Sequence, residues 1–141
     1  MELLNLDELL NQLSLTKEAF DANSQQIMKL ENTLRDSKIN LPYSIEYKEE
    51  ELNDGRVERR DIAWGYYEKQ SQYRLLIVCT IFTPTALHGN IVDSTLPIDI
   101  AMRPLIEAKL AVRADAIINF QKFADGFAEF LKTTRVKLSK A

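Results

Sequence analysis

The chain has 141 residues, of which 45% are hydrophobic and 28% are charged, and its formal net charge is −3. This size fits one compact domain, and the apolar fraction is too high for a disordered chain. No segment approaches the roughly 18 consecutive apolar residues of a membrane-spanning helix. A single cysteine and a single histidine exclude a disulfide framework and any Cys/His-rich metal site.

Charge is distributed unevenly along the chain. Residues 1–61 hold 14 acidic and 8 basic side chains, a net charge of −6, whereas residues 62–141 hold 7 acidic and 10 basic side chains, a net charge of +3. One interpretation is that the acidic and basic residues form two separate solvent-exposed faces. The alternative is that the acidic part of the chain attracts the basic part, within one chain or between two copies. The acidic balance disfavours a dedicated duplex-DNA binder, which usually carries a basic excess.

Residues 5–37 are predicted to form one long helix. The segment from Asn5 to Glu8 has the pattern of a capping box, with Asn5 as the N-cap. A hydroxyl in the segment 14–16 offers an alternative start for a second helix, which would kink the first. Apolar residues recur every seven positions, which is typical of a helix that packs along another helix. This predicted seam consists of Leu6, Leu13, Phe20, Ile27 and Leu34.

Residues 42–82 are predicted to form an antiparallel sheet. The segment 43–48 alternates apolar and polar side chains, as a half-buried strand does. The Asp54-Gly55 pair suits a type I′ hairpin turn, which joins this strand to a return strand. A second polar turn leads to the most apolar segment, 73–82, which we expect to be a central strand covered on both faces. Because both turns are short, a meander is the simplest topology.

Residues 83–103 are expected to be an irregular connection. Pro84, Gly89 and Pro97 interrupt any regular pattern, although a short fourth strand is compatible with the apolar residues between them. The fold expected from these segments is α+β. It has a long N-terminal helix, a three- to four-stranded antiparallel meander, and a long C-terminal helix packed on the sheet.

The second long helix is predicted over residues 104–133. Pro104 suits its first turn, and a wide apolar stripe suits packing on a sheet or on several helices. A glycine inside a helix costs about 1 kcal/mol relative to alanine, so Gly126 indicates close backbone packing. Residues 134–141 are expected to be a frayed basic tail.

The predicted helices are long for a domain of this size. A helix of 30 residues is roughly 45 Å long, whereas a compact 141-residue domain is about 37 Å across. Both long helices would therefore match or overhang the domain. An overhanging helix with an apolar seven-residue repeat needs a partner helix, so a homodimer is expected, with parallel and antiparallel pairing both open.

Candidate catalytic groups are sparse. His88 precedes Asp93 and Ser94, but no nucleophile-elbow pattern surrounds any serine, so a loop histidine is the preferred interpretation. Cys79 lies in the apolar centre of a predicted strand and is expected to behave as a small hydrophobe. Asp93 and Asp99 lack a cation-binding loop motif. No catalytic, cofactor-binding or metal-binding residue is predicted, and the chain is not expected to be an enzyme.

Aromatic residues with a polar tip gather in the predicted sheet. All five tyrosines and the only tryptophan lie between residues 43 and 73, together with several arginines. This composition is typical of a protein-binding hot spot, and it also suits stacking of single-stranded bases. In a second interpretation Trp64 and Tyr66 are core residues, which leaves Arg59 and Tyr67 as surface candidates. The predicted partner-binding residues are Arg59, Arg60, Trp64 and Tyr67.

These features predict a non-catalytic protein-interaction module of the adaptor, chaperone or inhibitor type. It is expected to act as a homodimer through the aromatic and arginine-rich sheet surface, without a cofactor and without membrane association. A single reduced cysteine fits a cytoplasmic location. Single-stranded nucleic-acid binding is the first alternative, and a small enzyme or ligand carrier with a site in residues 84–103 is the second.

Overall fold

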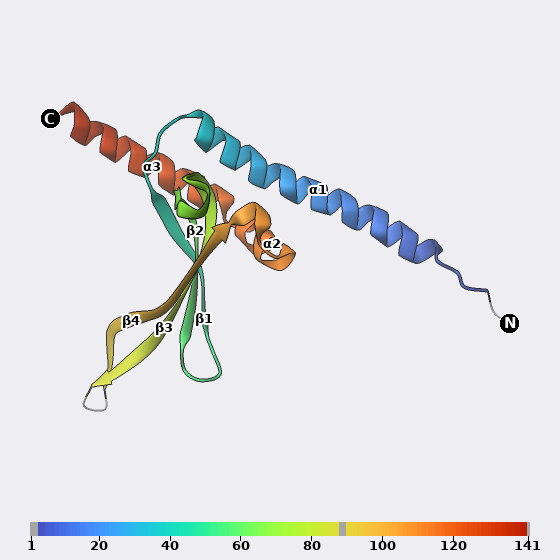
Figure 1. The fold of residues 1–141 in the computed structure, drawn as a ribbon, viewed down its shortest axis with the longest axis horizontal. Helices are drawn as coiled ribbons and strands as arrows, with labels where there is room; N and C mark the ends of the chain where they lie inside the picture. The colour runs from blue at the N-terminus through green and yellow to red at the C-terminus, as the bar shows by residue number, and fades with distance from the viewer. Residues whose placement is uncertain (1–2, 88–89, 141) are drawn as a thin grey trace.

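The predicted α+β fold is confirmed by a computed structural model of the chain. The structure describes residues 3–87 and 90–140, without the side chains of residues 84–96 and of residue 98. Four strands form one antiparallel sheet in the order β1-β2-β3-β4 (Figure 1). The elements in chain order are α1 (Asp7–Asp36), β1 (Tyr43–Glu51), β2 (Val57–Tyr67), the short 3-10 helix η1 (Glu68–Gln70), β3 (Gln72–Leu87), β4 (Asn90–Pro104), a second 3-10 helix η2 (Leu105–Glu107), α2 (Leu110–Ile118) and α3 (Phe120–Ser139).

The hydrophobic core lies between one face of the sheet and the helices. Alternate residues of β2 and β3 point into it and meet residues of all three α-helices, because side chains of a strand alternate between its two faces. The far ends of both hairpins extend beyond the helices, as Figure 1 shows. The buried core residues are Ile27, Ile62, Trp64, Leu75, Ile77, Leu105, Ala108, Ala116, Phe123 and Phe127.

β3 is a central strand as expected, and side chains on both of its faces are buried, but helices pack on only one face among the described residues. The second face of the sheet carries a smaller cluster that contains strand residues only, namely Ala63, Tyr67 and Leu76 with Val78 beside them. Leu76 is only 2% exposed even though it lies on the face without helices. Leu76 clusters there with side chains of neighbouring strand positions.

Residues 83–103 are not an irregular connection, because most of them belong to β3 and to the 15-residue strand β4. The prolines are accommodated where the pairing permits them. Pro97 lies in an edge strand, where a missing N–H donor is tolerated. Pro84 lies two residues beyond Phe82, the last residue of β3 that pairs with β2. The register with β4 shifts between Thr83 and Thr85.

The predicted single helix over 104–133 is two helices. Pro104 ends β4 opposite Leu76 and does not begin a helix. Asn119 separates α2 from α3, since its side-chain amide donates to the Asp115 carbonyl at 2.9 Å and its backbone N–H donates to the Ala116 carbonyl. An asparagine that bonds to local backbone in this way competes with helix continuation. The expected frayed tail is also wrong, because α3 continues to Ser139.

Two side-chain clusters fasten the C-terminal half of α1 to the rest of the domain. Glu31, which is 6% exposed, accepts two hydrogen bonds from Arg74, at 3.0 and 3.1 Å, and one from the Leu75 N–H at 2.8 Å. Arg113 of α2 donates to Asn23 at 3.0 Å, to Ser24 at 2.5 Å and to the Ile106 carbonyl at 3.2 Å. Charge-assisted hydrogen bonds of this kind fix both position and orientation.

Three local predictions have mixed outcomes. The hairpin at Asp54-Gly55 is confirmed, but only Gly55 has a positive φ (84°), so the turn is not type I′, which needs two such residues. The Asn5 side chain accepts a hydrogen bond from the Asp7 N–H at 3.0 Å, although the N-cap position itself is Leu6. Close packing at Gly126 is confirmed, because a Cβ there would overlap the Tyr43 hydroxyl.

Candidate protein-interaction surfaces

Two of the four predicted partner-binding residues are buried in the domain. Trp64 is 1% exposed, and its indole N–H donates to the Ile39 carbonyl at 3.3 Å. Tyr67 is 8% exposed and belongs to the cluster on the face without helices. Neither side chain offers a surface to a partner, so the interpretation of Trp64 as a core residue is the right one. The same interpretation is wrong for Tyr66, which is 52% exposed.

Arg59 and Arg60 are each paired within β2. Arg59 forms an ion pair with Asp61 at 3.2 Å and lies over the Phe82 ring at 5.2 Å. Arg60 donates to Glu58 at 2.9 Å. The two arginines lie on opposite faces of the sheet, because consecutive residues of a strand alternate. The four predicted residues therefore do not form one surface.

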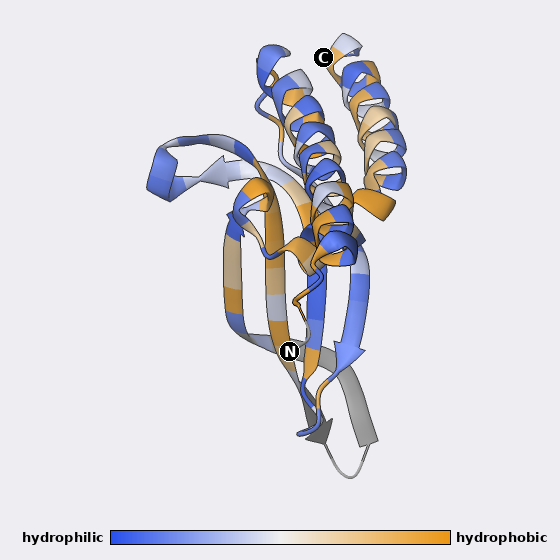
Figure 2. Cartoon of the chain, turned by 90° about the vertical axis from the view of Figure 1, so that its right-hand side faces the viewer, coloured by the Kyte–Doolittle hydropathy of each residue, from blue (hydrophilic) through white to orange (hydrophobic). Residues whose placement is uncertain are grey.

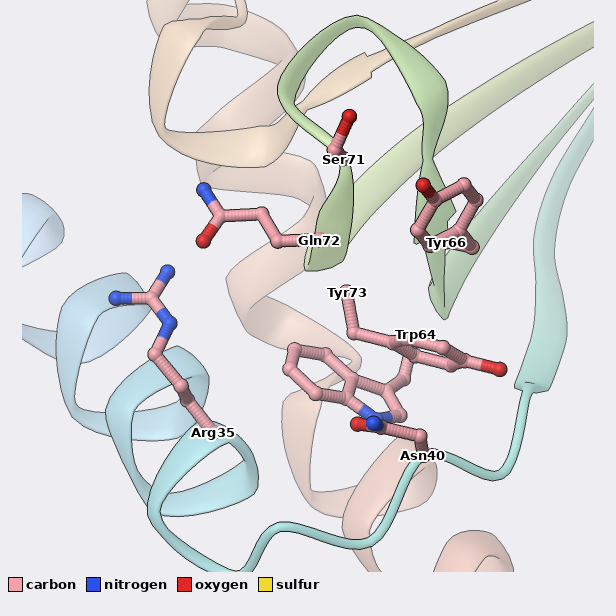
Figure 3. A pocket seen from close by; sticks show the side chains of 7 residues that line it. All are labelled: Arg35, Asn40, Trp64, Tyr66, Ser71, Gln72 and Tyr73. Carbon is pink, nitrogen blue, oxygen red and sulfur yellow. The ribbon is translucent and has the colours of Figure 1, made fainter.

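The structure instead brings aromatic residues and an arginine together at the end of the sheet where α1 ends. This aromatic hollow has a volume of about 330 Å³ and contains exposed Tyr66, half-buried Tyr73 and buried Trp64. The ring centroid of Tyr73 lies 5.6 Å from that of Trp64 and 6.1 Å from that of Tyr66. Arg35 and Gln72 reach toward one another across its rim in Figure 3. Its lining residues are Arg35, Asn40, Trp64, Tyr66, Ser71, Gln72 and Tyr73.

The hollow carries an excess positive charge on its α1 side. Arg35 lies 3.4 Å from the Glu31 carboxylate, which also accepts two bonds from Arg74. Two guanidinium groups therefore share one carboxylate, and the Arg35 side chain is 45% exposed. An exposed aromatic ring beside an arginine is the kind of surface that binds a protein segment with an acidic or aromatic side chain.

The N-terminal half of α1 is exposed along its whole length. Every described residue from Leu3 to Ala22 is exposed, and this half of the helix projects well beyond the sheet (Figure 1). Its apolar side chains are 40–59% exposed at Leu6, Leu9, Leu10, Leu13, Leu15 and Phe20. The predicted seam is therefore not one free surface, because Ile27 is fully buried and Leu34 packs against the core of its own domain.

A second hollow lies beside the C-terminal end of α1. This apolar groove of about 640 Å³ forms between the connection after α1 and the last turns of α3. α1 and α3 run in the same direction, so both helices end at this side of the molecule (Figures 1 and 2). Basic side chains stand at its rim. The groove is lined by Ile39, Leu41, Ala128, Leu131, Lys132, Thr134, Arg135 and Leu138.

Cys79 lies on the helix-covered face of β3 and is half-buried. Its thiol donates to Glu58 at 3.3 Å, in a cavity of about 260 Å³ that Arg60 and Arg103 also line. Burial raises the pKa of the Cys79 thiol, and the hydrogen bond to the Glu58 carboxylate raises it further. A thiol with a raised pKa holds little thiolate at neutral pH, which disfavours a nucleophilic role.

The proposed site in residues 84–103 lies mostly where side chains are not described. His88 is outside the described residues, and the Asp93 and Ser94 side chains are not described, whereas Asp99 is exposed in β4. Among the described residues, no three His, Cys, Asp or Glu side chains are grouped to hold a metal ion. None of the described helices has the length and apolarity needed to cross a membrane.

No family model, curated protein or solved structure matches the chain significantly. The candidate surfaces therefore rest on geometry. From the sequence, Tyr66 is named only in the interpretation that makes it a core residue, and Arg35 is not predicted as a binding residue. The spacing of Glu31 and Arg35, four residues apart on one helix face, carried a usable signal for Arg35, whereas the groove beside α3 had none.

Proposed function

We propose that the protein is a non-catalytic protein-interaction module that self-associates through the projecting half of α1 and binds a second protein at the aromatic hollow. The observation that carries the proposal is the exposure of every described residue from Leu3 to Ala22. An isolated helix of this length is only marginally stable in water, because most helical stability in proteins comes from tertiary packing. A row of leucines on such a helix is stabilised when another apolar surface covers it.

The aromatic hollow supports binding of a separate protein. Tyr66 combines an exposed ring with a hydroxyl group, and Arg35 provides a half-exposed guanidinium group. Tyrosine and arginine are enriched among residues that dominate binding energy, because each combines a large contact area with directional hydrogen bonds. The hollow also lies next to the domain core, so its floor of Trp64 and Tyr73 is held in place.

The geometry gives less support to the nucleic-acid alternative. Base stacking needs an exposed aromatic face, and Trp64 is 1% exposed. Arg59 and Arg60 are paired with Asp61 and Glu58, which reduces their attraction for phosphate. We therefore keep protein binding as the proposed function.

Self-association is tested by light scattering and sedimentation over a range of protein concentrations. Wild-type protein is expected to form dimers, and the double variant Leu10→Glu/Leu13→Glu is expected to be monomeric with the same circular dichroism of its sheet. The matched control is Asn11→Glu/Ala22→Glu, which adds two carboxylates on the opposite face of the same helix. A monomeric wild-type protein at every concentration, or a dimer that both variants leave intact, contradicts the proposal.

Partner binding is tested by cross-linked affinity capture with wild-type protein, with Tyr66→Ala/Arg35→Ala, and with a control, Glu50→Gln, at the exposed hairpin tip. We expect one protein to be captured by the wild type and the control and to be lost with the hollow variant. Equal capture by all three proteins would place the partner elsewhere. Capture of a single-stranded oligonucleotide, with strong salt dependence, would favour the alternative function instead.

A further inference from the structure

We propose that the apolar groove beside α3 is the docking site for the N-terminal half of α1 of a second copy of this chain. The inference deepens the self-association proposed above and rests on it. It names the surface that covers the exposed leucines, and it predicts a closed, two-fold symmetric dimer in which each copy contributes one helix and one groove.

The two surfaces match in apolar character. In the projecting half of α1 the spacing of Leu6, Leu9, Leu10 and Leu13 puts these leucines on one side of the helix. The groove is lined mainly by Ile39, Leu41, Leu131 and Leu138. Leu138 is 70% exposed and Ile39 is 44% exposed, so the groove is itself an uncovered apolar surface. A helix laid in such a groove removes apolar area from water on both sides, at about 25 cal/mol for each Å² buried.

The two surfaces are complementary in charge. Residues 7–22 carry four acidic groups and one basic group, a net charge of −3. The groove is lined by two basic residues and by no acidic residue. Lys132 and Arg135 lie at the groove itself, and Asp7 and Glu8 lie in the first turn of α1. Opposite charges on two surfaces select the register in which they meet.

The position of the groove fits an antiparallel pair of α1 helices. The groove begins at Ile39, immediately beyond the C-terminal end of α1, and the free leucines lie at the other end of the same helix. When two α1 helices lie side by side in opposite directions, the N-terminal half of each therefore reaches the groove of the other. Both contacts then form at once, which closes the assembly and leaves no free helix to recruit a third copy.

A charge-swap experiment tests this arrangement in the full-length chain. Lys132→Glu/Arg135→Glu places acidic groups opposite the acidic first turn, and Asp7→Lys/Glu8→Lys places basic groups opposite the basic groove. Each variant alone is expected to dissociate at least about tenfold more readily than the wild type, because like charges then meet at both contacts. A mixture of the two variants is expected to form a heterodimer with nearly wild-type affinity, since both of its contacts are again complementary.

The matched control is Lys137→Glu/Lys140→Glu, which makes the same charge change at two positions that do not line the groove and is expected to leave self-association unchanged. Sedimentation equilibrium measures the dissociation constants. The groove assignment is overturned if the wild type dimerises but the groove variant dimerises equally well, or if the mixture stays as weak as its components. In those cases the self-association stands with a different interface. A wild-type protein that never dimerises removes both proposals.

Discussion

The contact between Gly126 and Tyr43 is the tightest packing constraint that the structure identifies. A Cβ at Gly126 would overlap the Tyr43 hydroxyl and would lie 3.2 Å from the ring carbon that bears it. Tyr43 cannot move away freely, because its ring packs against Phe123, Phe127 and Phe130 with centroids 5.0–5.5 Å apart. Gly126→Ala therefore forces the tyrosine out of an aromatic cluster.

The expected magnitude follows from two opposing terms. Alanine is favoured over glycine in a helix by about 1 kcal/mol. Overpacking a core costs typically 1–3 kcal/mol, and each aromatic pair that is lost adds about 0.5–1.5 kcal/mol. With one aromatic pair lost, Gly126→Ala is thus expected to lower the free energy of unfolding by about 0.5–3.5 kcal/mol, which is a decrease in Tm of roughly 2–12 °C for a domain of this size.

A double-mutant cycle separates the clash from the helix propensity. Tyr43→Phe removes the overlapping oxygen, so Gly126→Ala in that background is expected to be neutral or stabilising, which gives a coupling of about 2 kcal/mol. Ala124→Gly, at an exposed position of the same helix, reports the propensity term alone. Urea unfolding at one protein concentration provides the free energies. The reasoning is refuted if Gly126→Ala stabilises the protein equally in both backgrounds.

Three further predictions concern buried polar groups. Glu31→Ala leaves Arg74 without its buried partner and should destabilise the domain by about 3–5 kcal/mol, with faster hydrogen exchange in residues 23–36; an unchanged unfolding midpoint contradicts this. Glu58→Gln removes a carboxylate that raises the pKa of Cys79, so the thiolate fraction at pH 8 should increase and iodoacetamide should alkylate the thiol faster. An unchanged alkylation rate would place Glu58 away from the thiol. Burial raises the pKa of Tyr47 to about 12, so the folded state favours the protonated phenol. This contribution to stability is present below pH 10.0, the ordinary pKa of tyrosine, and is lost as the pH rises from there through 12. Tyr47→Phe should therefore flatten the decrease in unfolding free energy between pH 9 and pH 11. A decrease as steep as in the wild type contradicts this prediction.

Local sequence patterns determined the secondary structure wherever neighbours along the chain supply the physical cause. The seven-residue repeat and the alternation in 43–48 predicted α1 and β1 almost to their ends, and the short turns predicted the meander. Gly126 also revealed a close contact, because a glycine inside a helix is costly without one. Prolines misled the prediction over 83–103, since their tolerance depends on which side of a strand is paired.

Tertiary structure alone decided which of these residues are available to a partner. The aromatic and arginine composition was visible in the sequence, but the sheet places Trp64 in the core and Tyr66 at the surface, two residues apart on one strand. The register between β2 and β3 places Arg59 over the Phe82 ring, and local periodicity does not encode that contact. The seven-residue repeat in α1 likewise gave no sign that Ile27 lies inside the domain while Leu13 lies in solvent. The difference arises because β3 and α2 hold the C-terminal half of the helix, through Glu31 and Asn23, and the place where those two elements meet the helix is a property of the whole fold.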